Sequence, residues 1–171
     1  MIKYAALLLT VFAVLSCQTK QEDNRDLSDC LYAVPEAIFP EGTNAISDHH
    51  FSYDGVAGKE DLSFDEDGAR LHIIQSGCDH LKQEFRFQLP GARIPGTPGQ
   101  LIALAVRQFE RIAGLGPEFL VFEEWAEAIE AQSDEIGTGE PTALQPGFYV
   151  KVETEGTQKD AILVITLSDR P

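Results

Sequence analysis

The sequence predicts a single α+β domain: an antiparallel sheet of about four to six strands with an αα-hairpin packed on one face. Two observations predict this fold. Segments in which apolar and polar residues alternate, typical of half-buried strands, occur between residues 50 and 89 and again after residue 147. Between them, apolar residues recur every three or four positions, as in amphipathic helices. Strands, then two helices, then strands is an order typical of α+β folds.

The first β region is predicted from residue 50 to residue 89. Two alternating segments flank Asp67-Gly68, and both residues tolerate the positive φ angles of a type I′ turn, so we expect a hairpin there. A third alternating segment ends at residue 90, and residues 50–56 predict an additional edge strand. The inward apolar positions of these strands are Leu62, Phe64, Leu71, Ile73, Phe85, Phe87 and Leu89.

Two helices are predicted in the middle of the chain. Thr97 fits the N-cap of the first helix, with Pro98 at the first helical position and Gln100 completing a capping box. Gly114 ends this helix and Pro117 begins the second. Their apolar faces consist of Ile102, Ala105, Val106, Phe109, Ile112 and Ala113, then Phe122, Trp125, Ala126 and Ile129. The outer face of the second helix is acidic, with Glu118, Glu123, Glu124, Glu127, Glu130 and Asp134.

The last part of the chain predicts a second hairpin. Residues 148–152 and 162–166 alternate as strands do, and residues 155–158 form the turn between them. The second of these strands is apolar on both faces. We therefore expect it to lie in the centre of the sheet, under the helices.

The N-terminal residues have the features of a secretory signal peptide. Lys3 precedes an apolar run over residues 5–15, which is too short to span a membrane, and Ser16 precedes Cys17. The sequence Val-Leu-Ser-Cys over residues 14–17 resembles the lipobox of bacterial lipoproteins. This resemblance covers residues 1–17 only. The alternative is a plain secreted protein, cleaved before Cys17 without acylation.

The resemblance implies that Cys17 becomes the mature N-terminus and carries a diacylglyceryl group, often with a third acyl chain; palmitate is typical of such chains. The membrane would then be a partner through the lipid on Cys17. Gln18 implies transport to the outer membrane, facing the periplasm, since an aspartate at that position favours retention in the inner membrane. We expect a signal peptide over 1–16, a polar, flexible spacer over 17–29 and one globular domain over 30–171.

The composition is strongly acidic. The chain has 28 Asp and Glu against 13 Lys and Arg, a net charge of −15. Removal of residues 1–16, which contain one lysine, would leave 155 residues and a charge of −16. Such a chain is repelled by nucleic acids and anionic lipid headgroups, so we expect no nucleic-acid partner. It attracts cationic partners.

Three cysteines are present. With Cys17 assigned to lipid, Cys30 and Cys78 remain as an even pair in an oxidising compartment, so we predict a disulfide between them. Such a bond would reduce the conformational entropy of the unfolded chain and thereby stabilise the folded domain by about 4 kcal/mol. A redox or metal-binding pair is disfavoured because neither cysteine belongs to a C-x-x-C motif.

Several clusters of reactive side chains are candidate sites. Cys78, Asp79, His80 and Glu84 would suit a nucleophilic enzyme, but a disulfide at Cys78 would exclude this. Neighbouring residues on a strand also point to opposite faces. A metal site was considered for Asp48, His49, His50, Asp54, His72 and His80, and disfavoured because adjacent histidines on an extended chain cannot easily share one ion.

Two further site types fail on spacing. Asp61, Ser63, Asp65, Asp67 and Gly68 superficially resemble a calcium loop, but its last position would be Ile74 where a glutamate is required. No histidine stands three residues after a glutamate of the acidic helix, as a di-iron site requires. We therefore predict no catalytic residues, no metal and no cofactor.

The sequence accordingly favours a lipid-anchored cell-envelope protein with a non-enzymatic binding role and an unknown ligand. One version binds cationic proteins such as lysozymes, because the negative charge would speed their encounter. The alternative is a small periplasmic hydrolase that uses His80 or His50 with nearby carboxylates. Convergence of His80, Asp79 and Glu84 in a concave pocket would favour the enzyme.

Overall fold

The computed structural model describes residues 32–171 except 78, 92–94 and 158–160. The predicted signal peptide, the spacer and all three cysteines lie outside the described residues. None of the helices in the described part of the chain is long and apolar enough to cross a membrane.

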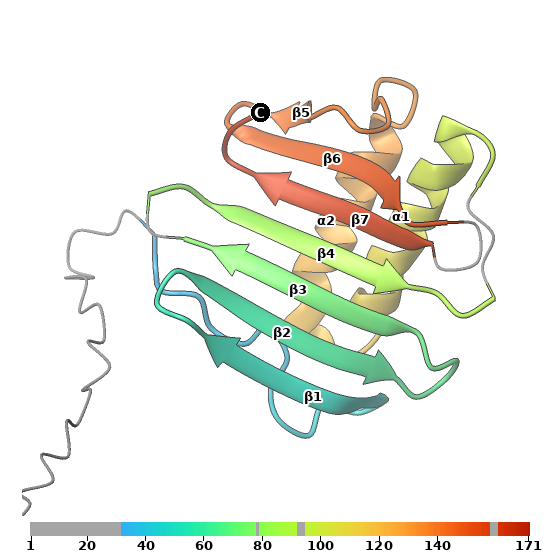
Figure 1. The fold of residues 1–171 in the computed structure, drawn as a ribbon. Helices are drawn as coiled ribbons and strands as arrows, with labels where there is room; N and C mark the ends of the chain where they lie inside the picture. Colours follow the sequence, from blue (N-terminus) through green and yellow to red (C-terminus); the bar gives the residue numbers. More distant parts are fainter. Residues whose placement is uncertain (1–31, 78, 92–94, 158–160) are drawn as a thin grey trace, which may run out of the picture.

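One antiparallel sheet contains all the named strands, in the order β1-β2-β3-β4-β7-β6-β5 (Figure 1). The strands are β1 (Ile46–Tyr53), β2 (Ala57–Phe64), β3 (Arg70–Ser76), β4 (Lys82–Gln88), β5 (Thr142–Gln145), β6 (Phe148–Glu155) and β7 (Ile162–Ser168). Two meanders, β1–β4 and β5–β7, join where β4 pairs with β7. The predicted α+β class and antiparallel sheet are confirmed. The predicted count of four to six strands is wrong, since the sheet has seven.

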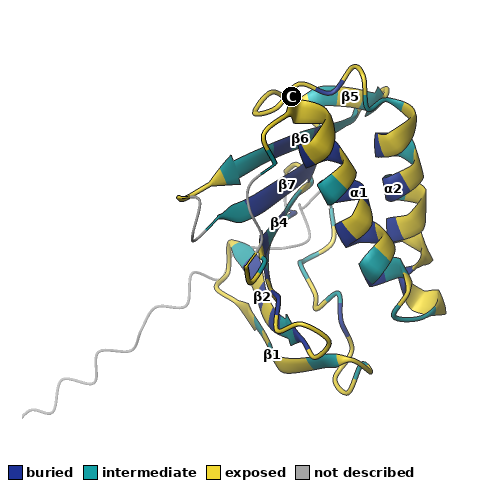
Figure 2. Ribbon diagram, turned by 90° about the vertical axis from the view of Figure 1, so that its right-hand side faces the viewer, coloured by how far each residue is buried: buried dark blue, intermediate teal, exposed yellow. Residues whose placement is uncertain are grey.

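The helices form the predicted hairpin and lie on one face of the sheet (Figure 2). They are α1 (Pro98–Ala113) and α2 (Leu120–Ala131), with a 3-10 turn, η2 (Pro117–Phe119), before α2. The hydroxyl of Thr97 accepts the N–H of Gln100 at 3.4 Å, so the predicted N-cap is confirmed. The opposite face of the sheet carries no helix from the described part of the chain, and we call it the open face.

Aromatic side chains fill the core between the helices and the sheet. Phe85 of β4 is 0% exposed, and its ring centroid lies 5.3 Å from that of Phe109 and 5.7 Å from that of Phe122. The ring centroid of Trp125 lies 5.0 Å from that of Phe122 in the same cluster. Next to β4, strand β7 is buried from Leu163 to Leu167, which confirms its predicted central position under the helices.

Residues 32–44, the N-terminal arm, cover the inner face of the sheet near β2 and β3. Phe39 is fully buried, with its ring centroid 5.1 Å from that of Phe119. The arm approaches the sheet so closely that a Cβ at Gly58 would lie 2.7 Å from the Cβ of Pro35. Glycine, which has no Cβ, is therefore required at this position of β2 so that the N-terminal arm can pack against the strand.

Glu60 of β2 fastens the arm. It is 0% exposed, and its carboxylate accepts the N–H of Ile38 at 2.8 Å and the N–H of Phe39 at 2.9 Å. A third contact joins Oε1 of Glu60 to Nε2 of His49 at 2.8 Å. A buried carboxylate is tolerated when such partners satisfy it.

The β2–β3 hairpin exists as predicted, but its turn does not have the predicted form. The loop runs over residues 65–69, and of its residues only Gly68 has a positive φ, of 69°, whereas a type I′ turn needs two. Asp67 instead accepts the N–H of Ala69 and forms an ion pair with Arg111 of α1 at 2.8 Å. The hydrogen bonds from Arg111 lower the pKa of Asp67.

Candidate functional site

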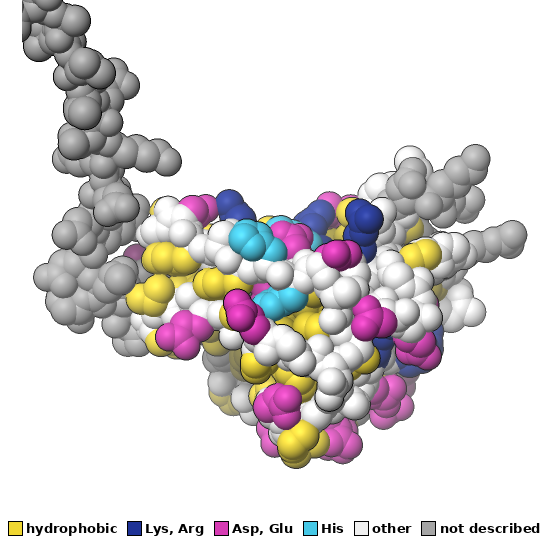
Figure 3. Space-filling view, turned by 90° about the horizontal axis from the view of Figure 1, so that it is seen from below, with side chains coloured by type: hydrophobic (Ala, Val, Ile, Leu, Met, Phe, Trp, Pro, Cys, Tyr) yellow, Lys and Arg dark blue, Asp and Glu magenta, His cyan; other side chains and the backbone are white. Residues whose placement is uncertain are grey.

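The open face collects the basic side chains of this acidic protein. Five of the eight lysines and arginines in the described part of the chain lie there: Lys59, Arg70, Lys82, Arg86 and Lys151. The helical layer, by contrast, exposes mainly acidic side chains. Seen from the β1 edge, histidines and several basic side chains lie along the upper rim of the molecule, and this rim is hollowed (Figure 3).

The strand register aligns polar side chains in a row across the open face. His50 of β1 lies opposite Asp61, Asp61 lies opposite His72, and His72 lies opposite Arg86 of β4. The Nδ1 atom of His72 lies 2.7 Å from Oδ1 of Asp61. Because a carboxylate oxygen accepts, Nδ1 of His72 is the donor in this contact.

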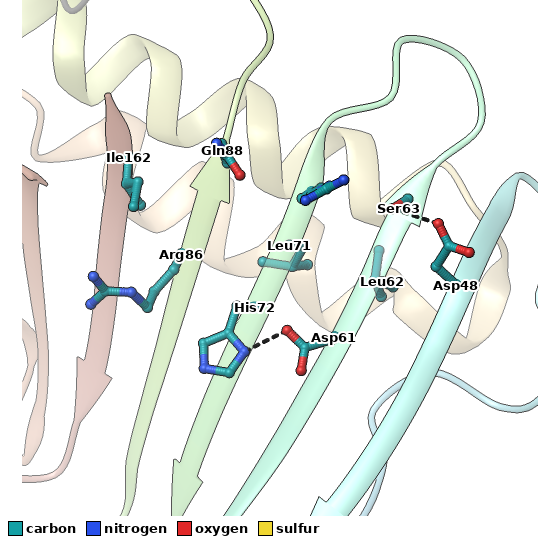
Figure 4. A pocket seen from close by; sticks show the side chains of 10 residues that line it. Asp48, Asp61, Leu62, Ser63, Leu71, His72, Arg86, Gln88 and Ile162 are labelled. Carbon is teal, nitrogen blue, oxygen red and sulfur yellow. Dashed lines mark hydrogen bonds and ion pairs between the residues drawn. The ribbon is translucent and has the colours of Figure 1, made fainter. Parts of the chain in front are cut away.

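A hollow of about 460 Å³ lies above this row, at the end of the sheet where β3 begins and β4 ends (Figure 4). The polar side chains that line it include Asp48, Ser63, Arg70, His72, Arg86 and Gln88. They come from four adjacent strands, so a ligand seated there would cross the strands rather than run along one of them. The floor is the sheet itself, with Leu62, Leu71 and Ile162 also in contact with the hollow.

Four of the five open-face cations are neutralised by acidic neighbours. Lys59 pairs with Asp54 at 2.8 Å, Lys82 with Glu84 at 3.3 Å and Lys151 with Glu153 at 2.7 Å. Arg86 pairs with Glu84 at 2.6 Å and also with Glu155. Arg70 forms no ion pair with any residue that the structure describes.

The ion pairs of Arg86 shift the pKa values of both Arg86 and Glu84. The hydrogen bonds that Arg86 donates to Glu155 and Glu84 raise the pKa of Arg86. Partial burial acts to raise the pKa of Glu84, but hydrogen bonds from Arg86 and Lys82 outweigh it and lower that pKa overall. Arg86 is therefore held as a fixed cation at one side of the hollow.

A β-bulge in β1 decides which side chains reach the hollow. Ser47 pairs with Ser63 and His50 with Asp61, so Asp48 and His49 together oppose Leu62. Asp48 has a φ of 52°, unusual for a residue other than glycine. The bulge directs Asp48 to the open face, where its carboxylate accepts a hydrogen bond from Ser63 at 3.3 Å, and it turns His49 inward to Glu60.

The residues weighed as metal ligands are distributed over different contacts. His49 contacts Glu60, and Asp61 lies between His50 and His72. Asp54 accepts hydrogen bonds from Lys59, Ala57 and Val56 in the β1–β2 turn, and these lower its pKa. Within the described residues, no group of three or more potential ligands is arranged to hold a metal ion.

The residues weighed as a hydrolase site do not converge in the described contacts. His80 is exposed in the β3–β4 connection, and the backbone carbonyl of Asp79 accepts a hydrogen bond from Arg170. Glu84 lies on the open face with Arg86 and Lys82. Cys78 lies outside the described residues, and His50 is exposed on β1.

Sequence reasoning missed Arg70, Arg86 and Gln88 as a set. Each stands at a polar position of an alternating strand, so its exposure was predictable. Their proximity was not, because it depends on the register of β3 against β4. Glu60 was also missed, although it stands in phase with Leu62 and Phe64 on β2, which is a signal that this acid is buried.

A second hollow, also of about 460 Å³, lies on the outer surface of the helical hairpin. Four glutamates line it, Glu110 from α1 and Glu123, Glu127 and Glu130 from α2. All four are exposed, which for Glu123, Glu127 and Glu130 confirms the predicted outer face of the second helix.

No known protein family matches this sequence, and no curated protein and no solved structure matches it either. Its function is therefore inferred from the geometry of the open face.

Proposed function

We propose that this chain is a lipid-anchored cell-envelope protein whose domain binds a ligand on the open face of its sheet. The lipobox-like residues 14–17 support lipidation at Cys17, and Gln18 supports a place at the outer membrane, facing the periplasm. The binding role rests on one observation. No helix of the described residues covers the open face, which holds a hollow of about 460 Å³ and carries most of the described basic side chains of an acidic protein.

The chemistry of the hollow supports binding rather than hydrolysis. Nucleophilic hydrolases commonly pair a hydroxyl or thiol with a histidine that acts as the base. In the hollow, the hydroxyl of Ser63 donates to Asp48, and His72 contacts Asp61, so the described contacts pair neither a hydroxyl nor a thiol with this histidine. The donors and acceptors therefore engage one another across neighbouring strands, which creates a rigid polar surface suited to recognition.

We also propose that Cys30 and Cys78 form a disulfide, since Gly77, the residue before Cys78, lies against Ala33, three residues after Cys30. A Cβ at Gly77 would lie 2.9 Å from the carbonyl oxygen of Ala33. We expect Cys78→Ala to lower the free energy of unfolding by about 2–5 kcal/mol. Reductant should abolish the difference between wild type and variant. Two free thiols in the unfolded, unreduced protein would contradict the pairing.

The acidic surface of the helices favours a second candidate, a cationic protein partner. The hollow lined by four glutamates would attract basic side chains, and charge of this kind mainly speeds association. This partner would bind on the opposite side of the domain from the open face.

Site-specific photocrosslinking in the producing cells separates the two candidates. A benzophenone amino acid would replace Ser47, which pairs with Ser63 at the edge of the open-face hollow, Ser52 on the same face, or Glu124 on the outer surface of α2; all three positions are exposed. We expect one adduct of discrete mass from the open-face positions, identified by mass spectrometry, and none from position 124. An adduct from position 124 alone would favour the cationic partner. No discrete adduct from any position would contradict a binding role.

A further inference from the structure

We propose that the open-face hollow binds the carboxylate or phosphate group of an anionic ligand, and that Arg70 is the residue that anchors it. This inference rests on the proposed binding role of the open face and names the chemistry of the ligand. Every other open-face cation is held by a carboxylate at 3.3 Å or less, whereas Arg70 has no ion pair with a described residue.

The cross-strand neighbours of Arg70 are neutral. Arg70 lies opposite Ser63 on β2 and opposite Gln88 on β4, both of which line the same hollow. Directly opposite positions are where acidic partners stabilise a basic side chain on a strand. Elsewhere on this face, basic side chains have acids nearby, and the whole chain has 28 acidic residues to supply them. The guanidinium of Arg70 is thus left with its charge available to a ligand.

Arginine is suited to this role by its geometry. The guanidinium presents five N–H donors in a planar fork that matches both oxygens of a carboxylate or two oxygens of a phosphate. The amide of Gln88 adds a further donor beside it. Arg86 contributes positive charge at the same side of the hollow, although its own donors are engaged by Glu84 and Glu155.

Two carboxylates also line the hollow and restrict the ligand. Oδ1 of Asp61 is occupied by His72, whose Nδ1 atom lies 2.7 Å away. Asp48 lies on β1, at the far end of the hollow from β4, and accepts from Ser63. A ligand that extends from Arg70 toward Asp48 should therefore carry an amine or hydroxyl donor at its second end. The hollow thus favours a small molecule, or the end of a larger one, with an anion and a donor group.

NMR titration of the purified mature protein tests this inference. The probes are inorganic phosphate, L-glutamate as a carboxylate that carries an amine, and glucose as a neutral control. We expect saturable shifts for an anion in the amides of residues 61–63, 70–72 and 86–88, and none for glucose. Saturation by glutamate alone identifies the carboxylate as the preferred group, and saturation by phosphate alone identifies the phosphate.

The matched variants are Arg70→Gln and Arg107→Gln. Arg107 is an exposed arginine of α1 that likewise has no described ion pair, so both variants change the net charge equally. We expect Arg70→Gln to raise the dissociation constant about tenfold or more and Arg107→Gln to leave it nearly unchanged. Equal weakening in both variants would show a general charge effect and overturn the inference.

Two other results would also overturn it: no saturable shift with either anion at millimolar concentration, or shifts confined to the helices. Crosslinks from the open face in the absence of anion binding would reject the anionic ligand while leaving the binding role intact. A thermal melt of each variant verifies that Arg70→Gln remains folded, as expected for an exposed side chain without described ion pairs.

Discussion

Glu60→Ala is expected to lower the free energy of unfolding by about 3–5 kcal/mol, a large part of the stability of a small domain. The substitution removes the acceptor of two backbone N–H groups, those of Ile38 and Phe39, and the partner of His49. Because Glu60 and Phe39 are both 0% exposed, water cannot replace the lost acceptor without opening the arm. Each buried donor left without a partner costs about 1–3 kcal/mol.

Urea unfolding of the purified protein measures this effect. Glu60→Gln keeps the shape and one acceptor oxygen, so we expect an intermediate loss. Glu36→Ala is the matched control, because Glu36 is an exposed acid of the same arm, and it should change stability little. A loss below about 1 kcal/mol for Glu60→Ala would show that the carboxylate does not fasten the arm.

Cys17→Ser is expected to release the protein from the membrane fraction. Only a thiol accepts the diacylglyceryl group of a lipoprotein, so a serine at this position would leave the chain without its lipid. Two or three acyl chains provide stable anchoring, whereas their loss leaves an acidic domain that anionic headgroups repel. The change should therefore be nearly complete.

Detergent-phase partition and mass spectrometry of the mature N-terminus provide the measurement. Cys30→Ser is the matched control, since it removes another cysteine from the same region and should leave partition unchanged. Membrane partition that persists in Cys17→Ser, with no lipid mass on the wild-type N-terminus, would refute the lipoprotein assignment.

The hydrophobic pattern predicted those elements whose burial can be read from their own sequence. In α1, Ile102, Val106 and Phe109 recur at helical spacing, and all are buried as expected. In β7, the absence of polar alternation indicated a strand buried on both faces, and Val164 is indeed only 1% exposed. In both cases the hydrophobic pattern itself carried the information.

The missed features depend on contacts between distant segments. Strand β5 has four residues and an irregular register near Gln145, so it has too few positions for a pattern to appear. The open-face hollow arises only after β1–β4 are registered, and the bulge at Asp48 shifts that register by one residue. The alternation of polar and apolar residues does not predict this extra residue in β1. Without the bulge, the same residues would place His49 on the open face.

The N-terminal arm also determines how the domain would bear a mechanical load. A pull on the chain ahead of Tyr32 would reach the sheet through contacts arranged in series: Tyr32 with Asp169, then the carbonyl of Glu36 with Gln75, then Glu60. Because these contacts would carry the force one after another, each would break separately. The arm would therefore detach from the sheet before the force reaches the hydrogen bonds between strands. A tethered domain with this arrangement has a built-in extension of about a dozen residues, roughly 40 Å at full stretch, that protects its sheet.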